Sequence, residues 1–137
     1  MELSRAAIVA IHGIAYLANH DGAKPLDVNE IAEALDIAPP YLAKIFQQLC
    51  RSNLVYSRRG PHGGYTLASD PKDISVMEIV EAIDGPVTTD KCELDPKGKC
   101  QWFKKCRIRK ELDTAKVKTK GIYRHITLDK FAGQFVA

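Results

Sequence analysis

The chain has 137 residues, of which 45% are hydrophobic, and a formal net charge of +3. Its length suits one domain, or one domain with an appended element. No apolar run approaches the ~20 residues of a membrane helix, and the N-terminal residues do not resemble a signal peptide, so we expect a soluble cytoplasmic protein with reduced thiols.

Regularly spaced hydrophobic residues predict the first two helices. Such residues recur every three or four positions between 3 and 18, which indicates an amphipathic helix. A loop rich in helix breakers follows. Asp27 then stands three residues before Glu30, and this pair resembles a capping box at the start of a second helix that ends near Asp36.

A tight turn separates the second helix from a third helix and a β-hairpin. Pro40 suits the first position of the third helix, where its missing N–H costs nothing. Asn53 is suited to the left-handed conformation that ends a helix. Residues 54–57 and 65–68 are predicted strands, and the seven residues between them include three glycines and one proline, which indicates a hairpin turn.

The second half of the chain is predicted to hold two more helices. Ser75 and Glu78 are placed to cap a fourth helix that ends at Gly85. Residues 88–106 are loop-like, and residues 127–136 support no assignment. Between these stretches, apolar positions at alternating four- and three-residue steps predict a long helix that packs against another helix. These positions are Ile108, Leu112, Ala115, Thr119 and Ile122.

Positive charge is concentrated in the predicted third helix and hairpin. No acidic residue occurs between Asp36 and Asp70, where four basic residues lie, and the other 16 basic and 17 acidic residues sum to −1. This distribution is typical of a surface that binds a polyanion. A helix of this kind fits the DNA major groove, and an arginine-tipped hairpin can enter the minor groove. The alternative is a small helical domain with a solvated hairpin.

These features predict a mainly α fold with a small β-hairpin wing, which is a winged helix-turn-helix with a long C-terminal dimerisation helix. We expect a DNA-binding domain at 1–86, a cysteine-bearing loop at 87–106, and the dimerisation helix with a C-terminal segment at 107–137. Two-fold symmetry would place the two reading heads on half-sites about 34 Å apart or at multiples of that spacing. The predicted DNA-binding residues are Tyr41, Lys44, Gln48, Arg51, Arg58, Arg59, His62 and Gly63. The basic residues of the long helix are predicted to form a solvated face, with DNA contact as the lesser alternative.

Three of the four cysteines lie close together in the predicted loop. Seven residues separate Cys92 from Cys100, and five separate Cys100 from Cys106. In a reducing compartment such a group indicates a metal or redox site rather than disulfides. The spacing lacks the Cys-x-x-Cys pair of structural zinc sites, so it favours an iron–sulfur cluster over zinc. Unliganded surface cysteines are the third interpretation, and Cys50 is predicted to be a packing residue.

The chain resembles the Rrf-type family of bacterial regulators over nearly its whole length. The most specific stretch is Arg-Arg-Gly-Pro-His-Gly-Gly-Tyr at 58–65, and residues 41–46 and 78–85 support it. The resemblance implies a homodimer that binds double-stranded operator DNA. It also implies a 2Fe-2S or 4Fe-4S cluster on Cys92, Cys100 and Cys106, whose state alters DNA affinity in response to iron–sulfur status, oxidative stress or nitric oxide.

The fourth cluster ligand departs from the family pattern. Some cluster-binding members have a histidine where this chain has Arg109, and others have an aspartate in the first helix where it has Ile8. The first cysteine gap is also longer than usual. The remaining candidates for the fourth ligand are Glu2, His12, Glu93 and Asp95.

Two other functions stay open. One is a cluster-free regulator whose cysteines sense oxidants as thiols. The other is an iron–sulfur or metal-binding interaction protein that does not regulate transcription. An enzyme is not expected, because the glycine-rich segment lies in a hairpin rather than at the start of a helix, and no catalytic constellation is evident.

Overall fold

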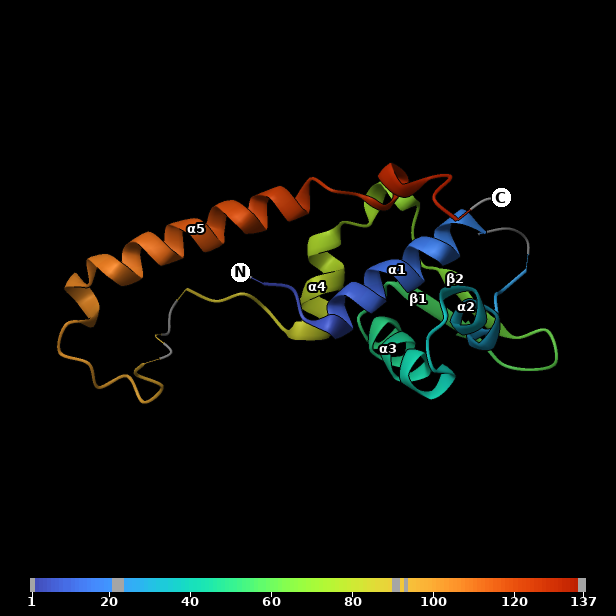
Figure 1. Ribbon diagram of the computed structural model, residues 1–137, viewed down its shortest axis with the longest axis horizontal. Coiled ribbons are helices and arrows are strands. Elements are labelled where there is room, and N and C mark those ends of the chain that lie inside the picture. The colour runs from blue at the N-terminus through green and yellow to red at the C-terminus, as the bar shows by residue number, and fades with distance from the viewer. Residues whose placement is uncertain (1, 21–23, 90–91, 93, 136–137) are drawn as a thin grey trace.

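The computed structural model describes residues 2–20, 24–89, 92 and 94–135. A helical head carries one long projecting helix (Figure 1). The helices are α1 (Arg5–Asn19), α2 (Val28–Leu35), α3 (Pro39–Arg51), α4 (Val76–Asp84) and α5 (Arg107–Arg124). The strands are β1 (Val55–Arg58) and β2 (Gly64–Leu67), and short 3-10 helices are η1 (Pro71–Asp73), η2 (Phe103–Lys105) and η3 (Leu128–Phe131).

The predicted helix-turn-helix is formed by α2 and α3. Asp27 caps α2 by accepting the Asn29 N–H at 2.8 Å, in place of the capping box predicted with Glu30. Asp36 ends α2 in the left-handed region, with a φ of 54°. The next helix begins at Pro39, one residue earlier than predicted. A proline is tolerated there because the first helical N–H groups have no partner within the helix.

The core of the head lies between α1 and α3. Ile14, Leu42 and Phe46 are fully buried there. Gly13 of α1 allows the two helices to approach closely, because a Cβ at this position would lie 2.9 Å from the Phe46 ring. This packing fixes which face of α3 points inward and leaves its polar face exposed.

The hairpin is a two-stranded antiparallel sheet in which Val55 pairs with Leu67 and Arg58 with Gly64. Both strands are shifted by one residue from the predicted positions. The sheet is attached to the chain ahead of α2, because the Tyr65 N–H donates to the Leu26 carbonyl at 2.7 Å. Gly64 is required for this approach, since a Cβ there would lie 2.3 Å from that same carbonyl oxygen.

Tyr65 also anchors the hairpin to the core of the head. Its ring centroid lies 4.9 Å from that of Phe46 in α3. Burial, and after it the nearby Cys50, raise the pKa of the Tyr65 hydroxyl. The hairpin and α3 therefore share one buried contact, which sets the position of the wing relative to the helix.

The fourth helix and the C-terminal segment complete the head. The predicted capping box is confirmed: the Glu78 N–H donates to the Ser75 hydroxyl, and the Ser75 N–H donates to the Glu78 carboxylate. After α5 the chain returns to α4, where the Val76 N–H donates to the Ile126 carbonyl at 2.7 Å. Leu128 of η3 then enters the core.

The projecting helix α5 has no buried residue. Figure 1 shows that residues 94–106, which lead into α5, lie at the end of the molecule farthest from α3. The predicted apolar seam of α5 is exposed, at 74% for Ile108, 58% for Leu112 and 63% for Ile122. An apolar row of this kind on a long helix favours packing against a partner. None of the described helices is long and apolar enough to cross a membrane.

Candidate nucleic-acid interface and cysteine loop

The outer face of α3 carries the predicted reading residues. Lys44, Gln48 and Arg51 are exposed, and Tyr41 is half-buried at the edge of the core. Lys and Gln side chains can donate to base edges, whereas Arg51, at the end of the helix, is placed for a phosphate. Four of the predicted residues therefore share one accessible helix face.

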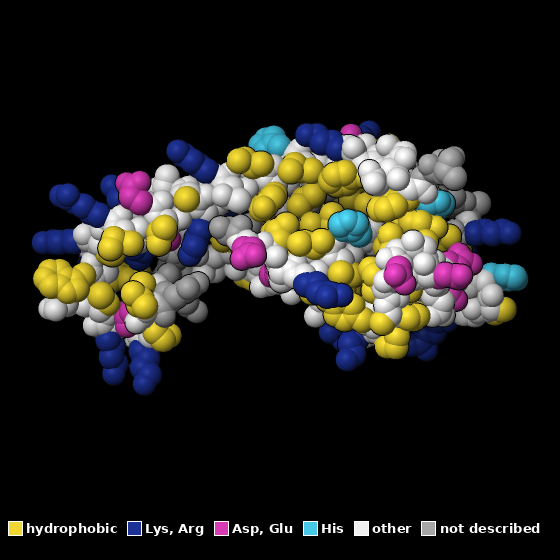
Figure 2. All heavy atoms as spheres, viewed as in Figure 1, with side chains coloured by type: hydrophobic (Ala, Val, Ile, Leu, Met, Phe, Trp, Pro, Cys, Tyr) yellow, Lys and Arg dark blue, Asp and Glu magenta, His cyan; other side chains and the backbone are white. Residues whose placement is uncertain are grey.

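The wing carries the other predicted residues. Arg58, Arg59 and His62 are exposed. Gly63 has a structural role, because a Cβ there would lie 2.2 Å from the Arg58 carbonyl oxygen, and its N–H donates to Gly60 at 2.9 Å. Of the two ion pairs found in the described part of the chain, one lies within α5 and the other joins α5 to α4, so neither involves α3 or the wing. Figure 2 shows Lys and Arg side chains along the lower side of the head, where Figure 1 places α3.

The cysteine loop (residues 88–106) is folded around Asp95. The Asp95 carboxylate accepts the Lys99 N–H at 2.8 Å and the Cys100 N–H at 2.6 Å, one on each oxygen. The Asp95 N–H donates in turn to the Cys92 carbonyl at 2.9 Å. Asp95 therefore connects Cys92 to Cys100 through the backbone, and both of its oxygens are already engaged.

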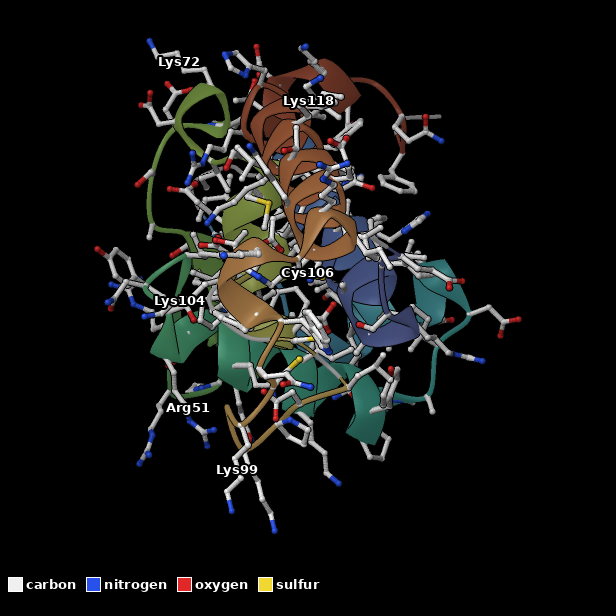
Figure 3. The ribbon with its side chains drawn as sticks, turned by 90° about the vertical axis from the view of Figure 1, so that its left-hand side faces the viewer. Arg51, Lys72, Lys99, Lys104, Cys106 and Lys118 are labelled. Carbon is white, nitrogen blue, oxygen red and sulfur yellow. The ribbon has the colours of Figure 1, made fainter. Side chains whose placement is uncertain are left out.

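The third cysteine begins α5. The Cys106 sulfur accepts the Arg109 N–H at 3.4 Å and so caps the helix. Figure 3, viewed along the long axis, places Cys106 at the near end of α5. In the same view Lys99 of the loop and Arg51 of α3 point to the same lower side of the molecule.

Arg109 stands where some family members have a ligand histidine, and here it is a structural residue. Its Nη1 donates to the Thr89 carbonyl at 3.2 Å and to the Asp113 carboxylate at 3.0 Å, and its Nε donates to the Phe103 carbonyl at 3.3 Å. The guanidinium carbon lies 4.0 Å from the centroid of the Phe103 ring. The sequence interpretation missed these contacts, although Asp113 at i+4 was an available signal.

The three loop thiols have the right donor chemistry for an iron–sulfur cluster, but they are not gathered at one point. Cys92 and Cys106 are half-buried, and Cys100 is exposed. Across the described residues, no group of three His, Cys, Asp or Glu side chains is placed to hold a metal ion. Cys50 packs against the core of the head, as expected.

The candidate fourth ligands also lie apart from one another. The His12 Nδ1 is 2.8 Å from the Ile8 carbonyl, and the His12 ring faces Phe135 at 6.5 Å between centroids. Glu2 is exposed ahead of α1. Glu93 lies outside the described residues. The His12 contact uses Nδ1 and not Nε2, so it does not exclude His12 as a ligand, whereas both Asp95 oxygens already accept backbone N–H groups.

The geometry defines a winged helix-turn-helix protein with an appended cysteine loop and a projecting helix. The chain belongs to the Rrf2 family, described as iron-dependent transcriptional regulators, whose sequence profile matches residues 3–134.

Named relatives agree with this assignment. The HTH-type transcriptional regulator IscR of Escherichia coli is 35% identical over 106 residues, which cover 77% of this chain and 64% of that protein. The chain thus matches less than two thirds of that relative's length. The solved structure of IscR from T. potens has 26% identity and a TM-score of 0.74, and the match covers 94% of this chain and 84% of that one. CymR, the global cysteine regulator of B. subtilis, has 25% identity and a TM-score of 0.72, with 98% of both chains covered.

Proposed function

We propose that the protein is a DNA-binding transcriptional regulator that reads operator DNA with α3 and the wing. The observation that carries this proposal is the exposed, acid-free face of α3 beside the arginines of the wing. Tyr65 contacts both Phe46 and Leu26, so the helix and the wing form one rigid reading surface. A rigid surface loses less conformational entropy when it binds the duplex.

We propose that the protein acts as a homodimer through α5. The exposed seam of Ile108, Leu112 and Ile122 would be buried when two copies pair. Within one chain the described part of the cysteine loop lies far from α3. Antiparallel pairing of two α5 helices would carry the loop of one copy toward the head of the other.

We further propose that an iron–sulfur cluster, of 2Fe-2S or 4Fe-4S type, controls operator affinity. Cys92, Cys100 and Cys106 would supply three thiolate ligands, and the description of the family as iron-dependent supports this assignment. Whether the loop holds a cluster would then depend on iron supply and on oxidants. Holding it requires this chain to draw its three thiols together, which changes the shape of the loop at the end of α5.

A cluster-free thiol regulator is the second candidate. It is favoured by the partial or full exposure of the three loop thiols and by their separation in the structure. The similarity to a global cysteine regulator is consistent with this reading. The two candidates share the same DNA surface and differ only in what the loop responds to.

Anaerobic purification followed by operator-binding assays tests these proposals. A brown protein with iron and acid-labile sulfide, both lost in C100S but kept in C50A, supports the cluster. A colourless protein whose DNA binding still responds to oxidant through the loop cysteines supports the thiol regulator. Iron–sulfur content without salt-dependent operator binding would instead indicate an interaction protein, and the DNA-binding proposal would fail.

A further inference from the structure

Arg109 connects the two ends of the cysteine loop to α5. Its guanidinium donates to Thr89, where the loop begins, and to Phe103, near where it ends. The same group is paired with Asp113, one turn further along α5. A single side chain therefore closes the neck of the loop and fastens it to the helix.

The position of each cysteine depends on these anchors. Cys92 is three residues after Thr89, and Phe103 is three residues from both Cys100 and Cys106. The backbone N–H of Arg109 itself donates to the Cys106 sulfur. No loop thiol is more than three residues from a point that Arg109 holds.

The chemistry of arginine suits this role and excludes ligation. A guanidinium has five donors in a planar fork and no acceptor, so it cannot bind iron but can span several oxygens at once. Its flat face also stacks on the Phe103 ring at 4.0 Å. Lysine has a single compact ammonium and cannot reproduce this set of contacts.

We propose that Arg109 is the positioning residue of the cysteine loop, which closes the neck of the loop and so sets the spacing of Cys92, Cys100 and Cys106. This proposal rests on the proposed function in one respect, which is what the loop is for. A loop whose two ends are already held together has fewer conformations to lose, so bringing its thiols together costs less entropy.

The chain contains its own reporter of this arrangement. Trp102 is the single tryptophan, lies next to Phe103 and is 67% exposed. Its time-resolved fluorescence anisotropy therefore reports motion of the neck in reduced, metal-free protein. A second readout is the affinity for Cd²⁺, followed through the thiolate-to-cadmium charge-transfer absorption.

The test compares R109M with R107M, which removes a charge two residues away and outside the hydrogen bonds of Arg109. We expect R109M to increase the fast motion of Trp102 and to weaken Cd²⁺ binding about 10-fold, as loss of a supporting residue around a metal site does. R107M is expected to resemble the parent protein in both measurements. R109K is the second variant, should R109M fold poorly, and is expected to shift both readouts in the same direction.

Equal behaviour of R109M and R107M in either measurement would overturn the proposal. Faster motion of Trp102 with unchanged Cd²⁺ affinity in R109M would also count against the proposal, because the arginine would then order the loop without positioning its thiols. Neither readout needs DNA or iron. Failure of operator binding would therefore refute the proposed function and leave this result standing.

Discussion

The Lys120 ammonium lies 2.9 Å from Glu81 Oε1, and this ion pair joins α5 to α4 at the base of the projecting helix. The two side chains are only 22% and 32% exposed. Glu81 Oε1 is itself out of contact with solvent and, within the described part of the chain, has no directed hydrogen bond. The lysine therefore acts as a nearby charge, and it fixes the point at which α5 leaves the head.

Removing this lysine should destabilise the protein more than removing an exposed one. In K120M the inaccessible carboxylate oxygen loses the ammonium that lies 2.9 Å away, so we expect the free energy of unfolding to fall by about 1–3 kcal/mol. The matched control is K118M, on the exposed surface of the same helix, with an expected change within about 0.5 kcal/mol. Denaturant unfolding measures both, and equal losses would show that the pair contributes nothing particular.

Neutralising the two wing arginines should reduce the electrostatic part of operator binding. Each phosphate contact contributes about 0.9 to the slope of log affinity against log salt, so R58A/R59A should weaken binding at low salt and flatten that slope by up to about 2. K72A is the control, because Figure 3 shows Lys72 on the side of the molecule opposite Arg51. An unchanged slope in a correctly folded dimer would remove the wing from the interface.

Adding one methyl group should have opposite effects at two glycines. At Gly63 the new Cβ would lie 2.2 Å from a backbone oxygen, so G63A should distort the wing, at a cost of about 1–3 kcal/mol, and impair DNA binding. At Gly121 of α5 nothing lies within 4 Å, so G121A should stabilise the helix by up to about 1 kcal/mol. Thermal unfolding measures the change in stability of each variant, and an operator-binding assay measures the change in DNA affinity. Wild-type DNA affinity in G63A would mean that the wing tolerates a different turn.

A charge placed in the α5 seam should dissociate the dimer, whereas the same charge on another face should not. Leu112 and Val117 are similarly exposed, at 58% and 60%. They are five residues apart and so point about 140° away from each other around the helix. We expect L112K to sediment as a monomer and V117K as a dimer at the same concentration. Dimers of both variants would place the interface outside the proposed seam.

Features that depend on neighbours in sequence were predictable. The Ser75–Glu78 capping box and the left-handed Asn53, with a φ of 60°, involve residues a few positions apart, so their residue types indicate the geometry directly. The helix and strand periods also follow from which side chains must avoid water. The exposed face of α3 and the apolar seam of α5 were accessible to the same reasoning.

Features that depend on distant segments needed the tertiary structure. Arg109 meets Thr89 across 20 positions, and the sequence alone suggested only a missing ligand. The pattern of residues 127–136 indicates no element, yet Leu128 packs in the core of the head.

The amino-acid pattern by itself determined the local elements, the basic reading surface and the grouping of the cysteines, because each follows from short-range spacing and charge. Only the tertiary structure decided that the cysteine loop lies at the far end of α5, with its neck closed by Arg109. That placement results from contacts between segments that are remote in the chain. Residue type and spacing do not indicate which remote segments will meet.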